Sequence, residues 1–212
     1  DQASVCTDSA CCQGYISPED YLAKGGTEVN IQKIRNAVLD TDAFVLTYGG
    51  ELIEATYFSC SGGTTEDAVA VWGKDVAYLQ SVASPGEEGA THYTDTVTFS
   101  SDEFKERLSI ESREEASHWI GKVTYTAGGG VDTILIAGKQ FRGTEIRKLL
   151  DLRSTAFEIR CEHGSFTVTT RGYGHRVGMS QYGADAMAAS GSGFEEILAH
   201  YYQGTALKQM DD

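Results

Sequence analysis

The chain has 212 residues, of which 41% are hydrophobic, and it carries a formal net charge of −14. This length and apolar content are enough to bury one sizeable core or two modest ones. The negative charge disfavours nucleic acid as a partner, because nucleic-acid binding needs a basic surface. No apolar run approaches the roughly 20 residues of a membrane-spanning helix.

Three of the five cysteines cluster near the start of the chain, at Cys6, Cys11 and Cys12. Such a cluster suits tetrahedral zinc, which prefers Cys and His ligands. Adjacent Cys11 and Cys12 are awkward as joint ligands, so a two-cysteine site, a Cys6–Cys12 disulfide and free thiols all stay open. Cys60 and Cys161 lie far apart in sequence, and we expect both to behave as small buried hydrophobes.

The first elements expected along the chain are a helix and a hairpin. Asn30 can cap a helix that carries Ile31, Ile34 and Val38 on one stripe and ends near residue 40. Two strand-like runs, residues 44–48 and 51–58, flank the pair at residues 49–50, which is Gly-Gly. A Gly-Gly pair between such runs is a strong hairpin signal.

Later signals complete the prediction of an α+β fold. Strands are expected at residues 78–82, 94–99, 131–136 and 166–170, and a flexible loop at residues 128–130. Ser100-x-x-Glu103 and Ser192-x-x-Glu195 read as capping boxes, and Thr144 opens a helix through residue 150. We expect a mixed sheet core with short helices, formed by residues 1–85 and 158–212, and an inserted or appended smaller α+β subdomain at residues 86–157.

The most informative segment is GYGHRVGMSQYGADAM, residues 172–187. Ser180 can cap an Ala-rich helix, and the free N–H groups beyond it attract a ligand oxygen or an anion. An ordinary capped strand-to-helix joint explains the same residues equally well, because His175 is alone and a short Gly-rich turn is a weak motif.

A second segment, ATYFSCSGGTTEDAVAVWG at residues 55–73, adds weight to a functional interpretation. The predicted hairpin delivers its residues 57–63 to one end of the sheet. There the Gly62-Gly63 pair would let the backbone approach a ligand closely, although any tight loop requires the same freedom.

Together the two segments resemble the stage II sporulation protein D family. The resemblance covers nearly the whole chain. It continues through Ser84-Pro85, through residues 152–155 and through the closing residues 197–205. The matching positions within the two motifs are Tyr57, Ser59, Ser61, Gly62, Gly63, Thr65, Glu66, Trp72, Gly73, Tyr78, Leu79, Gly174, His175, Val177, Gly178, Met179, Ser180, Gln181, Gly183 and Ala184.

The departures from the family pattern are few. Tyr173 and Tyr182 stand where Trp is common, Arg176 where Gly is common, and Ala77 where Pro is usual. At the cysteine cluster, family members can carry Cys-x-x-x-x-His-Cys, and Cys11 stands at the position of that His.

The resemblance implies a bacterial cell-wall enzyme. It would be a lytic transglycosylase that cuts peptidoglycan between N-acetylmuramic acid (MurNAc) and N-acetylglucosamine (GlcNAc), leaving 1,6-anhydro ends during spore engulfment. The family's catalytic glutamate is expected upstream of residue 1, so we expect the 212 residues alone to be inactive. The resemblance also implies an upstream membrane anchor, an extracytoplasmic location between mother-cell and forespore membranes, a partner wall amidase and a membrane scaffold.

On this interpretation, the visible motifs form the part of the site that positions the sugar. We expect Tyr57, Ser61 and Thr65 to line a glycan cleft, with His175 and Gln181 facing them. Glu66 is expected to bind substrate or to pair with backbone N–H groups rather than to act as the acid. Trp72 could stack on a sugar face, but a core position is favoured. His175 could be ordered by backbone contacts or could handle protons.

Other acidic residues are expected to lie on the solvated surface; they are Glu87, Glu88, Glu114 and Glu115.

Two functions of other classes stay open. The first is a non-catalytic peptidoglycan-binding module that enhances a wall amidase. The second is a zinc-dependent hydrolase built on the three clustered cysteines and His175, although catalytic zinc sites use His or carboxylate ligands more often than three thiolates.

Overall fold

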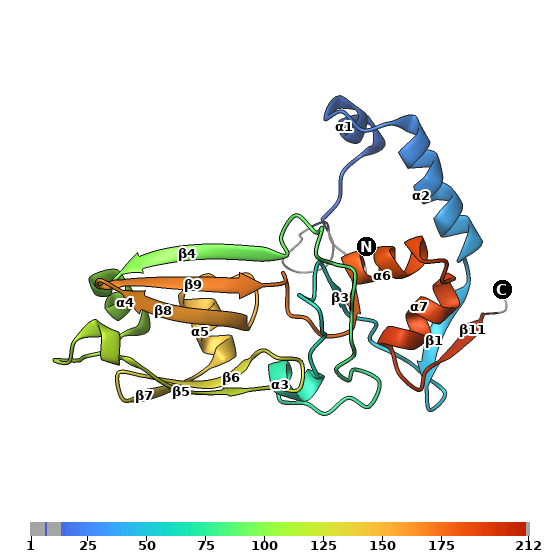
Figure 1. Cartoon of the computed structure of the whole chain (residues 1–212). Helices are drawn as coiled ribbons and strands as arrows, with labels where there is room; N and C mark the ends of the chain where they lie inside the picture. Colours follow the sequence, from blue (N-terminus) through green and yellow to red (C-terminus); the bar gives the residue numbers. More distant parts are fainter. Residues whose placement is uncertain (1–6, 8–13, 211–212) are drawn as a thin grey trace, which may run out of the picture. The chain divides into compact units, whose positions relative to one another are not determined.

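The computed structural model describes residue 7 and residues 14–210 of the chain (Figure 1). Its mixture of helices and small sheets confirms the predicted α+β class. The helices are α1 (Pro18–Ala23), α2 (Glu28–Asp40), α3 (Ala68–Trp72), α4 (Ser101–Leu108), the 3-10 helix η1 (Ala116–His118), α5 (Gly143–Leu149), α6 (Gln181–Ala189) and α7 (Phe194–Tyr201). The strands are β1 (Phe44–Tyr48), β2 (Glu51–Leu52), β3 (Tyr57–Phe58), β4 (Thr94–Ser100), β5 (Ile120–Tyr125), β6 (Val131–Ile136), β7 (Lys139–Arg142), β8 (Ala156–Glu162), β9 (Ser165–Arg171), β10 (Met179–Ser180) and β11 (Ala206–Gln209).

The chain divides into two compact units, Asp1–Val45 with Gln209–Asp212, and Leu46–Lys208. In the first unit, α1 begins after Ser17, whose hydroxyl accepts a hydrogen bond from the backbone N–H of Asp20 at 3.0 Å. Helix α2 begins earlier than predicted. Its cap is Thr27, which accepts from the backbone N–H of Asn30 at 3.2 Å, so Asn30 lies inside the first turn.

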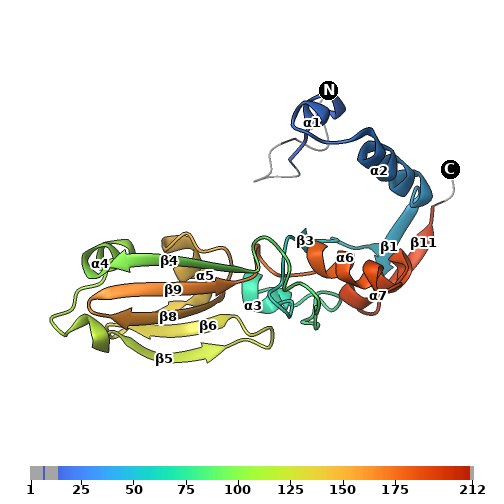
Figure 2. The same cartoon turned by 45° about the horizontal axis from the view of Figure 1, so that its top comes forward.

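The second unit contains two antiparallel three-stranded sheets, with strand orders β4-β9-β8 and β5-β6-β7. Strands β4 and β9 pair along their whole lengths, from Thr94 opposite Arg171 to Ser100 opposite Ser165. In both views the two sheets lie side by side, with α5 packed beside them (Figures 1 and 2). The predicted strands at residues 94–99, 131–136 and 166–170 are confirmed as β4, β6 and β9.

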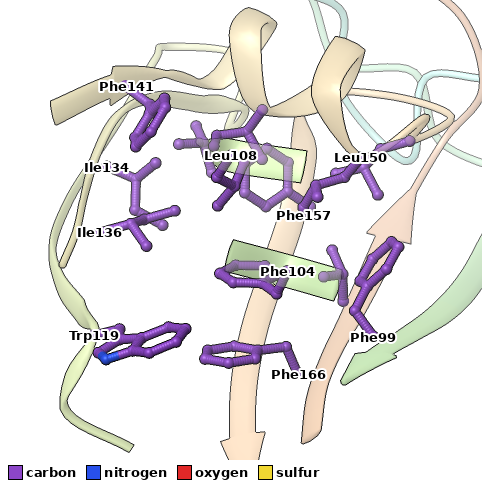
Figure 3. Close-up of a cluster of buried hydrophobic side chains, with 14 of the residues drawn as sticks. Phe99, Phe104, Leu108, Trp119, Ile134, Ile136, Phe141, Leu150, Phe157 and Phe166 are labelled. Atoms are coloured by element: carbon purple, nitrogen blue, oxygen red, sulfur yellow. The ribbon is translucent and has the colours of Figure 1, made fainter. Parts of the chain in front are cut away.

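Aromatic side chains fill the space between these elements. The ring of Phe104 from α4 stacks on Phe166 from β9 at a centroid distance of 4.0 Å, and Trp119 lies 5.5 Å from Phe166 (Figure 3). This core collects residues from Phe99 to Val168. It therefore contains residues from both sides of the predicted boundary at residue 157, and that boundary itself stays a prediction.

A second buried cluster lies beneath the two sequence motifs. It combines Ala68, Leu79, Val82, Val177, Ile197, Tyr201 and Tyr202. The strand predicted at residues 78–82 is absent, because this segment pairs with residues 65–68 through single hydrogen bonds rather than a ladder. The backbone N–H of Thr65 donates to the carbonyl of Val82 at 2.8 Å, and that of Ala68 donates to Leu79 at 3.0 Å.

Candidate functional site

The two motifs meet through backbone pairing. Strand β3 runs parallel to β10, with Tyr57 opposite Met179, although the two residues lie more than a hundred positions apart in sequence. Beyond β3, the backbones of Cys60 and Tyr173 exchange two hydrogen bonds, of 3.1 and 2.7 Å. The segments at residues 55–73 and 172–187 therefore form one assembly, and α6 begins directly after β10.

The predicted cap of α6 is confirmed. The hydroxyl of Ser180 accepts a hydrogen bond from the backbone N–H of Gly183 at 3.2 Å. Ser180 is completely buried, and its hydroxyl also donates to the carboxylate of Glu87. The cap is thus part of a larger buried network rather than a solvent-exposed helix start.

Glu66 forms a buried ion pair with Arg176 across the two motifs. Its Oε1 lies 3.1 Å from a guanidinium nitrogen of Arg176, and both side chains are almost fully buried. The same oxygen accepts hydrogen bonds from the hydroxyl of Thr126 at 2.8 Å and from the backbone N–H of Gly130 at 2.9 Å. The loop at residues 128–130, predicted to be flexible, is therefore tied to this carboxylate, and a Cβ at Gly130 would come within 2.2 Å of Oε1.

Arg176 satisfies three backbone carbonyls from two loops at once. Its guanidinium donates to the carbonyls of Ser61, Thr64 and Gly128, each at 2.7 Å. Its own φ is +67°, in the left-handed region that favours glycine. In this chain the hydrogen bonds and the ion pair offset the strain of a side chain at this φ.

Glu87 is the main correction to the sequence interpretation. It was expected on the solvated surface, but its exposed fraction is 1%. One carboxylate oxygen accepts from the backbone and hydroxyl of Ser61 at 2.8 and 2.7 Å and from the backbone N–H of Gly62 at 2.9 Å. The other accepts from the hydroxyls of Ser84, at 2.7 Å, and Ser180. Glu87 thereby joins the Ser-Gly-Gly loop to the start of α6.

The hydrogen bonds decide the ionisation of Glu87. Burial alone would raise its pKa, but the hydroxyls of Ser180, Ser61 and Ser84 lower the pKa below its usual value. We therefore treat Glu87 as an anion held by donors. One sequence signal pointed to it, because Glu87 follows closely after Ser84-Pro85, a segment within the family resemblance.

Ser61 and Thr65, predicted to line a cleft, are both completely buried. Ser61 donates to Glu87, and the Thr65 hydroxyl accepts from the backbone N–H of Val82 at 2.8 Å. Gln181 is exposed at the first turn of α6, and Tyr57 is 41% exposed. The predicted site residues thus separate into an inner set that holds loops together and an outer set that solvent reaches.

His175 is intermediate in burial between the inner and the outer set. Its Nδ1 accepts a hydrogen bond from the backbone N–H of Val177 at 3.1 Å, so backbone contacts order the ring as one interpretation expected. The ring lies 5.3 Å from that of Trp72 and 5.6 Å from that of Phe58. Burial lowers the pKa of His175, which a hydrogen bond with the backbone of Tyr57 partly opposes. The structure therefore favours the neutral form of the His175 ring.

Aromatic side chains are exposed around the joined motifs. Trp72, for which a core position was favoured, is 47% exposed, and Tyr57, Tyr173 and Tyr182 are exposed by 36–41%. Tyr57 lies in β3 opposite Met179, Tyr173 pairs with Cys60, and the backbone N–H of Tyr182 donates to the carbonyl of Ser59 at 3.1 Å. Such rings can stack on the apolar faces of sugars, and their hydroxyl and indole groups supply hydrogen bonds.

The cysteine cluster, Cys6, Cys11 and Cys12, lies outside the described residues. Within the described part of the chain, no group of three or more His, Cys, Asp or Glu residues is placed to hold a metal ion. Cys60 is buried, as predicted, and burial raises the pKa of its thiol to about 12. Cys161 is a free thiol and only partly buried. Among the described residues, no helix is both long and apolar enough to cross a lipid bilayer.

A scan against protein-family models finds no match. Curated proteins are similar, however. Stage II sporulation protein D of Bacillus subtilis (strain 168) is 40% identical over 99% of this chain, and that of Bacillus amyloliquefaciens is also 40% identical over 99%. The amidase enhancer of Bacillus subtilis is 28% identical over 88% of the chain and 34% of its own length. The chain spans 62% of the length of the first of these relatives. The resemblance predicted from the two motifs is thus confirmed.

Proposed function

Because the chain is related to stage II sporulation protein D over nearly its whole length, we propose that the complete protein acts on the cell wall during sporulation as a peptidoglycan lytic transglycosylase. In this proposal, residues 46–208 hold the glycan strand in position. The observation that carries the proposal is the set of exposed rings, Tyr57, Trp72, Tyr173 and Tyr182, around two motifs that buried ionic groups lock together.

The burial of two carboxylates supports the proposal that these residues position the sugar and that another segment supplies the acid. Glycoside cleavage needs a carboxylic acid that can reach the leaving oxygen. Glu66 is enclosed by Arg176 and the loop at residues 128–130, and Glu87 is enclosed by five donor residues. Neither of these two carboxylates can therefore reach the leaving oxygen, and the family resemblance implies that the catalytic acid is a glutamate upstream of residue 1.

One carboxyl group is enough for the proposed reaction. It donates a proton to the glycosidic oxygen as the bond from that oxygen to C1 of MurNAc breaks. The C6 hydroxyl of the same sugar then bonds to C1 and returns its proton to the carboxylate, which restores the acid. The remaining requirement is that the sugar is oriented, which is the role assigned to the exposed rings, with Gln181 and His175 beside them.

The similarity to an amidase enhancer favours a second candidate. In this alternative the protein binds glycan without cutting it and increases the activity of a wall amidase. Both candidates share peptidoglycan as ligand, an extracytoplasmic location, and an amidase and a membrane scaffold as partners, and they differ in whether glycosidic bonds are broken.

Mass spectrometry of reaction products separates the two candidates. Amidase-stripped peptidoglycan would be incubated with the complete extracytoplasmic region and, in parallel, with the 212-residue chain. Anhydromuramyl ends from the complete region only are the expected result. Their absence from both reactions would contradict the transglycosylase and leave the enhancer, whose activity would then be measured as faster release of stem peptides by the amidase.

A further inference from the structure

Arg147 is a half-buried arginine without an acidic partner. The ion pairs formed by the described residues involve Arg107, Arg153, Arg160 and Arg176, and none involves Arg147. Its Nε donates to the carbonyl of Leu152 at 3.3 Å, which is the hydrogen bond that its side chain makes in the described structure. An uncompensated guanidinium at a partly buried position is unusual in a chain with a net charge of −14.

The surroundings of Arg147 belong to the candidate site. The hydrogen bond to Leu152 places the guanidinium beside the segment that contacts the second motif. In that segment the guanidinium of Arg153 lies over the ring of Tyr173 at 5.1 Å, and its carbonyl accepts from the backbone N–H of Gly174 at 3.0 Å. Arg147 also interacts electrostatically with Tyr173 and His175.

Two neighbouring arginines, unlike Arg147, form ion pairs. Arg153 is paired with Asp95 at 3.0 Å, and Arg176 is paired with Glu66. Arg142 and Arg171 also lack an ion pair, but both are exposed, so Arg147 is the partly buried arginine beside the two motifs whose charge is left uncompensated within the described structure. Its forked nitrogens match the geometry of a carboxylate, which a guanidinium binds through two parallel hydrogen bonds.

We propose that Arg147 binds a carboxylate of the muramic acid residue and so distinguishes muramyl glycan from neutral polymers of GlcNAc. This inference rests on the proposed glycan-binding function. The carboxylate has two possible sources, the free lactyl group of a stripped strand and the stem peptide of an unstripped one. Both present the same group to the guanidinium.

Titration calorimetry with four matched tetrasaccharides tests the proposal on the whole 212-residue chain. The ligands are a GlcNAc tetramer, a GlcNAc–MurNAc tetrasaccharide with free lactyl carboxylates, its neutral amide, and its stem-peptide derivative. We expect the wild type to bind a carboxylate-bearing ligand about tenfold more tightly than the amide. A preference for the free lactyl form identifies the lactyl source, and a preference for the peptide derivative alone identifies the peptide source.

The variants assign the preference to one residue. Arg147→Gln should abolish it and leave the affinity for the GlcNAc tetramer unchanged, whereas Arg147→Lys should keep part of it. Lys148→Gln on the same helix is the matched control for loss of one positive charge and should bind as the wild type does. Melting curves establish that each variant is folded. If Arg147→Gln does not fold, the affinities of Arg147→Lys are used to test the proposal.

Three results would overturn the inference. They are a wild type that binds all tetrasaccharides equally, an Arg147→Gln variant that keeps the full preference, and an equal loss in Lys148→Gln, which would indicate unspecific charge attraction. A wild type that binds none of the tetrasaccharides would remove the proposed glycan-binding function as well. The failure of the inference and the failure of the function are therefore distinguishable.

Discussion

The carboxylate of Glu66 lies 3.1 Å from the guanidinium of Arg176, 110 residues further along the chain, and both side chains are buried. This ion pair closes the two motifs onto each other beneath the exposed rings. Oε2 of Glu66 has no hydrogen-bond partner within the described structure, so the carboxylate depends on Arg176 and on the donors to Oε1.

Removing the charge of Glu66 should destabilise the fold. Glu66→Gln leaves the buried guanidinium of Arg176 uncompensated, which we expect to cost about 3 kcal/mol in the free energy of unfolding. Urea unfolding measures the loss. Glu158→Gln, which removes an exposed pair with Arg160 at 3.5 Å, is the control and should cost less than about 0.5 kcal/mol. Equal effects of the two substitutions would contradict the structural role of the ion pair.

The positive φ of Arg176 leads to a comparison of two substitutions. Arg176→Gly and Arg176→Ala lose the same hydrogen bonds, but only glycine adopts a φ of +67° without strain. We expect the glycine variant to be more stable than the alanine variant by about 1 kcal/mol. Thermal unfolding of the two variants side by side measures the difference, and a more stable alanine variant would contradict the backbone geometry.

The lowered pKa of Glu87 predicts that the protein loses stability in acid. Its pKa in the folded state lies below the ordinary value of 4.5. The stabilisation it contributes is therefore fully present above pH 4.5 and is lost as the pH falls through the lower, folded pKa. Glu87→Gln should be less stable than the wild type at neutral pH, by about 2 kcal/mol.

The stability difference between the wild type and Glu87→Gln should shrink as the pH falls below 4.5. Denaturant unfolding of both proteins across a series of pH values gives this difference directly. A difference that stays constant throughout the acid range would show that Glu87 does not ionise with a lowered pKa.

His175 should titrate below its ordinary value of 6.5. Because the folded state disfavours the imidazolium, stability is constant above pH 6.5 and falls as the pH decreases towards the folded pKa. NMR of the imidazole protons measures the midpoint in the wild type, with His175→Gln used for assignment. A midpoint above 6.5 would require a carboxylate partner that the described structure does not place beside this ring.

The cysteine cluster predicts bound zinc. Metal analysis of the purified chain should find about one zinc per molecule, and Cys6→Ser or Cys12→Ser should remove it. A Cys6–Cys12 disulfide would instead give no zinc and a mass lower by two hydrogens than that of the reduced chain. Mass spectrometry before and after reduction distinguishes the two outcomes, since only the disulfide makes the mass change on reduction.

Local signals explain which elements were predicted correctly. The hydroxyls of Ser100 and Ser180 cap the helices that their sequences predicted, and β9 follows a clear alternation of buried and exposed residues. Each of these features depends on residues within a few positions of one another. The helix at residues 194–201 also forms, although its N-cap is Gly193 rather than Ser192.

Long-range contacts explain what the sequence did not predict. The burial of Glu87 was not predicted, because its donors Ser61 and Ser180 come from distant segments. Arg176 was recognised only as a departure from glycine, and its role depends on carbonyls more than a hundred residues away. Trp72 ends a short helix with an apolar sequence, yet its ring lies at the surface against His175.

The central claim is that sugar binds at the joined motifs. NMR titration of the isotope-labelled chain with the GlcNAc–MurNAc tetrasaccharide tests it most directly. We predict that the largest shifts fall on the indole N–H of Trp72 and on the backbones of Tyr57, Tyr173 and Gln181. Shifts confined to the surface cavity lined by Glu158, Arg160 and Thr167, or no shifts at saturating ligand, would contradict the claim.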